Sequence, residues 1–172
     1  MRSHSLFILF LVTVFCLVNV EIADGFGMME IEKTAKECCT VSRRQCCIEV
    51  MKFGRPAKCG YENNAEWAEI FYNCIQRGLL AEDQRMSLDD GLCCQVFAHD
   101  TSDSSKHCEN TCKIAMHSPS LNKTERFEKI KKCSMLENPL DKCFHNCLKM
   151  RQNGFSVQVL DFSEYCNYTS TP

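Results

Sequence analysis

The sequence lacks the features that mark several common functional classes. Its 20 lysines and arginines nearly balance 22 aspartates and glutamates, which argues against a dedicated nucleic-acid binder and against a polybasic protein of membrane surfaces. It has no Gly-x-Ser-x-Gly motif and no His-Glu-x-x-His motif, so two common catalytic signatures are absent. After residue 18 no apolar run approaches the length of a membrane span. These absences predict a protein that binds no nucleic acid and does not span a membrane.

The first 25 residues have the layout of a secretory signal. Arg2 and His4 precede the apolar run 6–18, and Ala23-Asp24-Gly25 offers small residues at the spacing of a cleavage site. A run of about 13 residues is too short to cross roughly 30 Å of hydrocarbon. We therefore expect residues 1–25 to be a signal peptide, residues 26–172 to form one domain, and the protein to be secreted and extracellular.

Cysteine is the abundant residue, at 15 positions of 172. Removal of the signal takes away Cys16 and leaves 14, an even number in an exported chain, which is typical of a disulfide framework. No Cys-x-x-Cys spacing supports a zinc site, so we expect no metal and no other cofactor. The predicted disulfide residues are Cys38, Cys39, Cys46, Cys47, Cys59, Cys74, Cys93, Cys94, Cys108, Cys112, Cys133, Cys143, Cys147 and Cys166. Complete pairing would give seven disulfides.

The spacing of the cysteines constrains their pairing without fixing it. Three pairs are vicinal: Cys38-Cys39, Cys46-Cys47 and Cys93-Cys94. A bond between neighbours would close a strained ring, so each pair is expected to send its two sulfurs to different segments. Two further pairs lie one helical turn apart: Cys108 with Cys112, and Cys143 with Cys147. Fourteen cysteines allow on the order of 10⁵ pairings, and the sequence does not choose among them.

The apolar periodicity predicts an all-α fold, a small disulfide-rich bundle of about six helices with little or no β structure. Expected helix starts are Ser42 with Gln45, Asn63 with Glu66, Ser87 with Asp90, Ser104 or Ser105, Asn122 with Glu125, and Asn138 before Pro139. Expected ends are Gly54, Gly78 and Asn153-Gly154. Residues expected on buried faces include Trp67, Ile70, Phe71, Leu92 and Phe127. Only residues 155–159 alternate like a strand.

Two sequons predict N-glycosylation at Asn122 and Asn167. A glycan on Asn122 is expected to compete with the role of that side chain as a helix cap. The basic stretch 123–132 could contact sulfated glycans, but interleaved glutamates at i,i+4 spacing favour a solvated helix face.

The order of the cysteines resembles a known family. The matching residues are Cys38-Cys39, Cys74 ahead of Asp89-Asp90 and Cys93-Cys94, then Cys108-x-x-x-Cys112, Cys133 and Lys142-Cys143-Phe144. This order resembles the DB module, a cysteine-rich extracellular module of nematode proteins, over about residues 37–147. The first half departs from that pattern, because Cys46-Cys47 and a lone Cys59 stand where the module has a C-x3-C pair. The resemblance implies a secreted or ectodomain location and carries no catalytic residue to this chain.

These observations predict a secreted, non-catalytic protein that acts as a rigid binding or structural module for an extracellular protein or glycan. One alternative is a small secreted lipid hydrolase that resembles phospholipase A2. In those enzymes His-Asp follows the vicinal cysteines by two residues, whereas four residues separate Cys94 from His99-Asp100, which turns the histidine by about 200° on a helix. A second alternative is a helical ligand of the receptor or growth-factor type.

Overall fold

The computed structural model describes residues 26–100, 103, 105–132, 139–154 and 166. The regular secondary structure of these residues is helical, with no strand among them, so the predicted all-α class is confirmed. The predicted signal peptide (1–25), the predicted cap Asn138, Cys133, the strand-like residues 155–159 and Asn167 lie outside the described residues. The α-helices are α2 (Met28–Cys38), α3 (Arg44–Lys52), α4 (Ala65–Leu79), α5 (His107–Met116), α6 (Lys123–Lys131) and α7 (Pro139–Gln152). The 3₁₀ helices are η1 (Val41–Arg43), η2 (Glu82–Gln84) and η3 (Leu88–His99).

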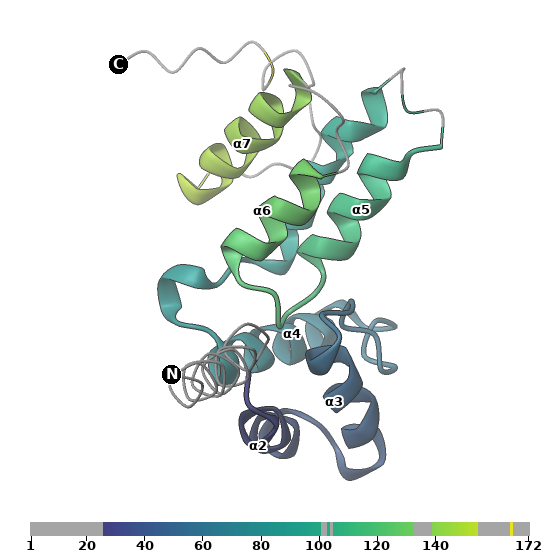
Figure 1. The fold of residues 1–172 in the computed structure, drawn as a ribbon, viewed down its shortest axis with the longest axis vertical. Helices are drawn as coiled ribbons and strands as arrows, with labels where there is room; N and C mark the ends of the chain where they lie inside the picture. The colour runs from purple at the N-terminus through teal and green to yellow at the C-terminus, as the bar shows by residue number, and fades with distance from the viewer. Residues whose placement is uncertain (1–25, 101–102, 104, 133–138, 155–165, 167–172) are drawn as a thin grey trace, which may run out of the picture.

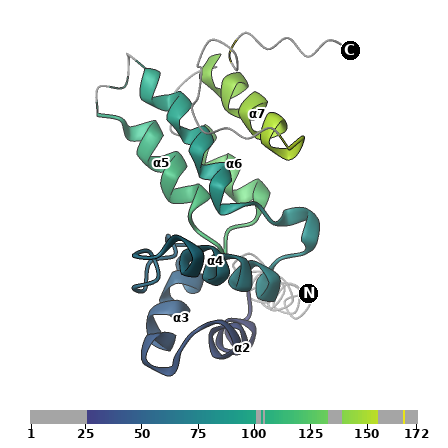
Figure 2. The same ribbon diagram turned by 180° about the vertical axis from the view of Figure 1, so that it is seen from behind.

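The helices gather into two lobes, which lie one above the other in Figure 1 and Figure 2. The first lobe, residues 28–80, packs α2 against α3 and α4. The second lobe, the described residues between 86 and 154 together with Cys166, packs η3 against α5 and α7, and α5 against α6. Each lobe has its own buried apolar cluster. The first includes Ile31, Ala35, Met51, Phe71 and Ile75, and the second includes Val96, Phe97, Met116, Ile130 and Phe144.

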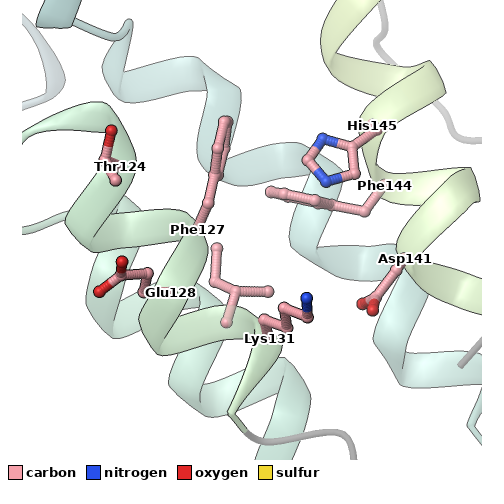
Figure 3. A pocket seen from close by; sticks show the side chains of 8 residues that line it. Thr124, Phe127, Glu128, Lys131, Asp141, Phe144 and His145 are labelled. Carbon is pink, nitrogen blue, oxygen red and sulfur yellow. The ribbon is translucent and has the colours of Figure 1, made fainter. Parts of the chain in front are cut away.

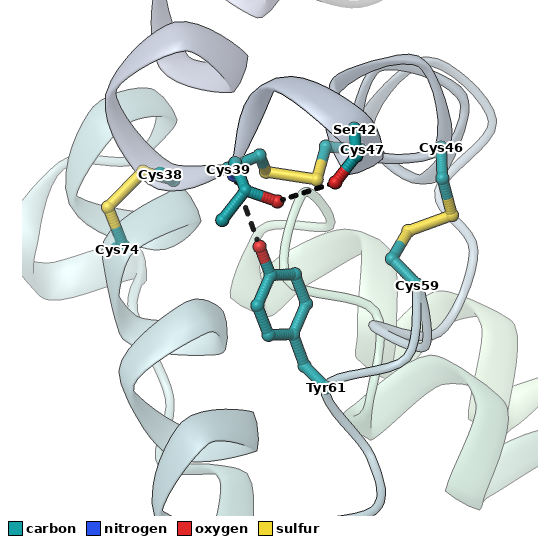
Figure 4. Close-up of a disulfide and its surroundings, with 9 residues drawn as sticks. Cys38, Cys39, Ser42, Cys46, Cys47, Cys59, Tyr61 and Cys74 are labelled. Atoms are coloured by element: carbon teal, nitrogen blue, oxygen red, sulfur yellow. Dashed lines mark hydrogen bonds between the residues drawn. A yellow bond between two sulfur atoms is a disulfide. The ribbon is translucent and has the colours of Figure 1, made fainter.

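The disulfides follow the same division. The first lobe contains Cys38–Cys74, Cys39–Cys47 and Cys46–Cys59, which Figure 4 shows together. The second lobe contains Cys93–Cys147, Cys94–Cys112 and Cys143–Cys166, and Cys108 is also disulfide-bonded. In every vicinal pair the two sulfurs reach different segments, as the strain argument predicts. Each closed loop restricts the unfolded chain and contributes about 2–4 kcal/mol to stability.

Several helix starts agree with the capping signals in the sequence. At α6 the Glu125 backbone N–H donates to Asn122 Oδ1 at 2.9 Å, and the Asn122 N–H donates to Glu125 Oε2 at 2.8 Å. A capping box of Ser87 and Asp90 begins η3 in the same way. These two signals work because each side chain satisfies a backbone N–H that the first helical turn leaves without a partner.

Other predicted starts are wrong by a short distance. Asn64, one residue after the predicted Asn63, caps α4 by accepting from the Trp67 N–H. Ser42 lies in η1 and does not cap α3. At α5 the side chain of Asp103, not that of Ser105, accepts from the Cys108 N–H, at 2.7 Å. The residue at the N-cap position is Lys106, whose side chain makes no capping hydrogen bond, so the upstream carboxylate satisfies this N–H instead.

The predicted buried face of α4 is wrong at two positions. Trp67 is 57% exposed and Ile70 is 58% exposed, whereas Phe71 and Ile75 are buried. Leu92 of η3 is likewise 40% exposed. The interior face of α4 lies one position further along and includes Tyr72 and Gln76, whose polar atoms are hydrogen-bonded to the second lobe.

Gly78 does not end α4, as the sequence predicted, but lies inside it. A Cβ atom at this position would lie 2.6 Å from Thr34 Oγ1 of α2. Glycine is therefore needed here because α2 and α4 approach closely, and not because the helix ends at this position.

A buried arginine joins the lobes. Arg126 of α6 is fully buried, and its Nη1 donates to the Tyr72 hydroxyl of α4 at 2.6 Å. Its Nη2 donates to the Ser118 carbonyl at 3.0 Å. The Tyr72 hydroxyl in turn donates to the Met116 carbonyl at 2.8 Å. Burial raises the pKa of Tyr72 to about 12 despite the nearby guanidinium, so this hydroxyl stays protonated and can donate.

Gln76, one turn after Tyr72, extends the same junction. Its Nε2 donates to the Met86 carbonyl at 2.7 Å, and its Oε1 accepts from the Met86 N–H at 2.9 Å. Arg126 Nη2 also donates to that Oε1, at 3.3 Å. Polar side chains of α4 thus satisfy backbone groups of the chain that enters the second lobe, which fixes how the two lobes sit against each other.

Candidate functional site

A groove of about 410 Å³ lies where the first lobe meets α5 of the second. Its lining comes from α3, from the chain that follows α3, and from α5. These residues are Cys46, Glu49, Val50, Arg55, Pro56, Lys58 and Ile114. Ile114 is 53% exposed, so its side chain offers apolar surface at one wall. Residues 53–58, which we call the 53–58 segment, supply much of the other wall.

The sequence fixes the first turn of the 53–58 segment through one glycine. Gly54 adopts the left-handed conformation (φ 55°), in which a side chain is strained. A Cβ atom there would also lie 2.7 Å from Leu121 Cδ2 of the second lobe. The backbone of the next residue is held against α3, since the Arg55 N–H donates to the Val50 carbonyl at 3.0 Å. Glycine is thus required both by the turn and by the close contact between lobes.

The far end of the 53–58 segment is also held in place. The Ala57 N–H donates to the His117 carbonyl of the second lobe at 2.9 Å. The next cysteine, Cys59, is bonded to Cys46 of α3, as Figure 4 shows. Hydrogen bonds and a disulfide therefore hold this exposed segment against both lobes. The segment loses its conformational entropy when the protein folds, so little more is lost when a partner binds.

The surface beside the groove is aromatic and cationic. Phe53 is 54% exposed, and two cations lie over its ring: Lys52 Nζ at 5.4 Å and Arg55 Cζ at 4.9 Å from the centroid. Lys58 adds a third cation at the groove lining. Within the described part of the chain, no carboxylate forms an ion pair with any of these three. The carboxylate in the lining, Glu49, accepts from Gln45 Nε2 at 3.5 Å.

A smaller hollow of about 220 Å³ also borders the 53–58 segment. Its lining residues are Pro56, Ala57, Lys58, Glu62, Ala68, Leu88 and His117. Burial lowers the pKa of His117, and the positive charges of Lys113 and Arg126 lower it further. The imidazole is therefore neutral at physiological pH and lies against Gly91, where a Cβ atom would be 2.8 Å from Nε2.

A third hollow, of about 240 Å³, lies between α6 and α7 (Figure 3). Its lining residues are Thr124, Phe127, Glu128, Ile130, Lys131, Asp141, Phe144 and His145. The rings of Phe127 and His145 meet edge to face, with centroids 5.1 Å apart. Burial lowers the pKa of His145, with the charge of Asp141 opposing the shift. Part of the α6 face that the sequence predicts to be solvated thus borders an apolar hollow.

The predicted site residues within the described part of the chain are structural or lie apart from the groove. The described cysteines are all disulfide-bonded, Cys46 among them at the groove. Asn122, partly exposed, caps α6. His99, the histidine of the hydrolase alternative, is exposed at the last residue of η3. Among the described residues no three His, Cys, Asp or Glu side chains could hold a metal ion, and no helix has the length and apolarity of a membrane span.

Sequence reasoning missed the residues that form the groove. Arg55, Lys58 and Ile114 come from two lobes, and no local pattern connects them. Phe53, beside the groove, is different: it lies near an element end, where the sequence suggests that aromatic residues could form an exposed patch for a partner. One local signal is present in residues 52–56, at the end of a helix. Phe53 lies between the cations Lys52 and Arg55, and the turn-forming residues Gly54 and Pro56 are interleaved with them. Such a segment is expected at the surface with its aromatic residue exposed.

The comparisons with known proteins cover nearly all of the chain after residue 27. The family model that describes Caenorhabditis elegans Her-1 matches residues 28–170. This chain belongs to the Her-1 family. It is 45% identical to "Protein her-1" of Caenorhabditis elegans over 141 residues, which is 81% of each chain. The crystal structure of Caenorhabditis elegans HER-1 has a TM-score of 0.76 and 43% sequence identity, covering 82% of this chain and all of that one.

Membership of the Her-1 family overturns the resemblance to the DB module. The Her-1 match extends across both lobes, whereas the DB resemblance rested on the order of a few cysteines between residues 37 and 147. Vicinal and C-x3-C cysteines suit any helix that must be bridged to two neighbours, so their order does not distinguish one helical disulfide family from another.

Proposed function

We propose that this member of the Her-1 family is secreted and acts in the extracellular space as a ligand, by binding a partner protein and not by catalysis. The observation that supports this most directly is the 53–58 segment, which is tied to both lobes and still exposes Phe53 beside an open groove. An exposed aromatic ring on a rigid frame is typical of a protein interface, because it buries area with little loss of conformational entropy.

Two further features support secretion. The first 25 residues have the composition of an export signal. The described cysteines are disulfide-bonded, and such bonds persist in oxidising compartments and are rare in the cytosol. The predicted glycans at Asn122 and Asn167 belong to the same proposal, because the enzymes that attach them act on exported chains.

The first experiment tests export and oxidation. The full chain, with its own first 25 residues, is expressed in insect cells, and the culture medium is analysed by intact mass after deglycosylation. We expect a chain that starts near Phe26 and whose mass rises by 14 hydrogens on reduction, one for each remaining cysteine. Retention of the protein inside cells, or several thiols that react without reduction, would contradict the proposal.

The second experiment tests binding. The purified, fluorescently labelled protein is titrated onto intact cells of the source animal, with excess unlabelled protein as competitor. We expect saturable binding that the competitor displaces. Non-saturable binding alone, or lipid hydrolysis by the pure protein that a calcium chelator abolishes, would contradict a role as a non-catalytic ligand.

A further inference from the structure

We propose that the groove beside the 53–58 segment binds an acidic segment of the partner protein, in which carboxylates flank at least one apolar side chain. This inference rests on the proposed function as a ligand and names the chemistry of its partner. Three observations carry it: the charges around the groove, its apolar wall, and the fixed conformation of the segment.

The charges favour an anionic occupant. Lys52, Arg55 and Lys58 lie at or beside the groove, against one lining carboxylate, Glu49. Lys52 and Arg55 lie over the face of Phe53, where the ring attracts their charge without neutralising it. A carboxylate that approaches this surface therefore meets cations that no described acidic side chain pairs with. Such an arrangement accelerates association and selects an acidic partner.

The walls of the groove favour a peptide over a sulfated glycan. Val50 and Pro56 form part of the lining, and Ile114 presents a side chain that is 53% exposed. Phe53 extends the apolar surface beyond the groove. A sulfated glycan has no apolar side chain to cover this surface, whereas an acidic peptide can insert a leucine or phenylalanine against Ile114 while its carboxylates face Arg55 and Lys58.

The conformation of the 53–58 segment makes the site ready to bind. The turn at Gly54, the hydrogen bond from Ala57 to His117 and the disulfide Cys46–Cys59 hold the two walls at a fixed separation. A peptide that docks here loses its own freedom, but the protein loses little.

The test uses two substitutions with matched controls elsewhere on the surface. Arg55→Glu reverses a charge at the groove, and Arg77→Glu makes the same change at an exposed position of α4. Ile114→Asp removes the apolar wall, and Ile70→Asp makes the same change at a residue that is 58% exposed. All four variants are prepared oxidised, and free thiols and helical circular dichroism are measured to show that each is folded.

The probe is a phage-displayed library of random peptides, selected on the oxidised wild-type protein. We expect the selected peptides to be rich in aspartate and glutamate around an apolar residue. For the selected peptides, Arg55→Glu and Ile114→Asp should each raise Kd about tenfold or more, and the two controls should change it less than about twofold. Raising salt should weaken binding to wild type more than to Arg55→Glu.

Several results would overturn the inference. These are selection of no peptide, selected peptides without acidic enrichment, or equal loss of affinity in the control variants. Retention on a heparin column that Arg55→Glu abolishes and Ile114→Asp leaves unchanged, without peptide selection, would assign the groove to a sulfated glycan instead. Saturable binding to cells that both groove variants retain would refute the groove while leaving the proposed ligand function intact. Absence of saturable cell binding by wild type would instead refute the ligand function itself.

Discussion

Arg126 of α6 donates a hydrogen bond to the Tyr72 hydroxyl of α4 at 2.6 Å, so a fully buried guanidinium connects the two lobes. Burial lowers the pKa of Arg126, with Tyr72 opposing the shift, and no described carboxylate forms a direct ion pair with it. Its charge is accommodated by a hydroxyl, a carbonyl and an amide oxygen. The relative position of the two lobes therefore depends on three neutral acceptors, all of which must face the guanidinium at the same time.

Arg126→Met tests this dependence. The substitution leaves the buried Ser118 carbonyl without its guanidinium donor, and we expect the free energy of unfolding to fall by about 2 kcal/mol. The measurement is urea unfolding with disulfides intact. Lys129→Met, at an exposed position of the same helix, is the control and should change stability by less than about 0.5 kcal/mol. Equal stability of the two variants would show that relief of the buried charge offsets the lost hydrogen bonds.

Gly78→Ala should destabilise the first lobe although alanine is the better helix former. In an open helix the change would stabilise by about 1 kcal/mol, but here the new Cβ would lie 2.7 Å from Thr34 Cγ2. We expect a net loss of about 1–3 kcal/mol from overpacking. Thr34→Ala removes the atoms in conflict, so the double variant should be more stable than the sum of the two single changes predicts. Thermal unfolding of the two single variants and the double variant measures this difference. Losses of stability that simply add would show that a methyl group at position 78 and Thr34 do not clash.

The pH dependence of stability follows from His117. Because burial lowers its pKa in the folded state, the unfolded chain binds a proton near the ordinary value of 6.5 and the folded chain does not. Stability is therefore expected to fall as the pH falls from 7.5 to about 5.5, in the window below the unfolded pKa. His117→Gln should reduce this fall, measured as the shift in urea midpoint between the two pH values. His145 adds a contribution of the same sign.

Loss of the Cys46–Cys59 disulfide should loosen one wall of the groove. For the variant with both cysteines replaced by serine we expect a loss of about 3 kcal/mol, as for a short closed loop. We also expect faster tryptic cleavage after Lys52 or Lys58 under native conditions, because the 53–58 segment loses one of its anchors. Cys143 and Cys166 form a disulfide in the second lobe, and replacing both with serine should not accelerate cleavage at these sites. Equal cleavage in both variants would show that the remaining contacts hold the segment.

Glycosylation of Asn122 should be compatible with its role as a helix cap, contrary to the expectation from sequence. The cap uses Oδ1, which accepts from the Glu125 N–H, whereas a glycan is attached through Nδ2. Thr124→Ala should remove the glycan and leave stability nearly unchanged, whereas Asn122→Ala should remove both glycan and cap and cost about 1 kcal/mol. Mass spectrometry and thermal unfolding measure the two effects. A large loss in Thr124→Ala would show that the glycan itself stabilises α6.

The sequence predicted the features that depend on local chemistry. The helical class, the capping boxes at Asn122 and Ser87, and the start of α7 at Pro139 follow from hydrogen bonds within a few residues. The exposure of Trp67 and Ile70 could not be predicted, because an apolar helix face does not reveal how much of it a neighbour covers. The groove could not be predicted for the same reason: Ile114 and Arg55 are brought together only by the packing of the lobes.

The six cysteines from Cys38 to Cys74 bond only with one another. On the secretory route proposed above, a chain that enters N-terminus first delivers a complete set of partners before the second half has been synthesised. Six cysteines allow on the order of ten arrangements, against about 10⁵ for fourteen, so oxidation in the order of translocation removes nearly all the wrong choices. The half that emerges first can mature as a unit and then serve as a template against which the later half docks.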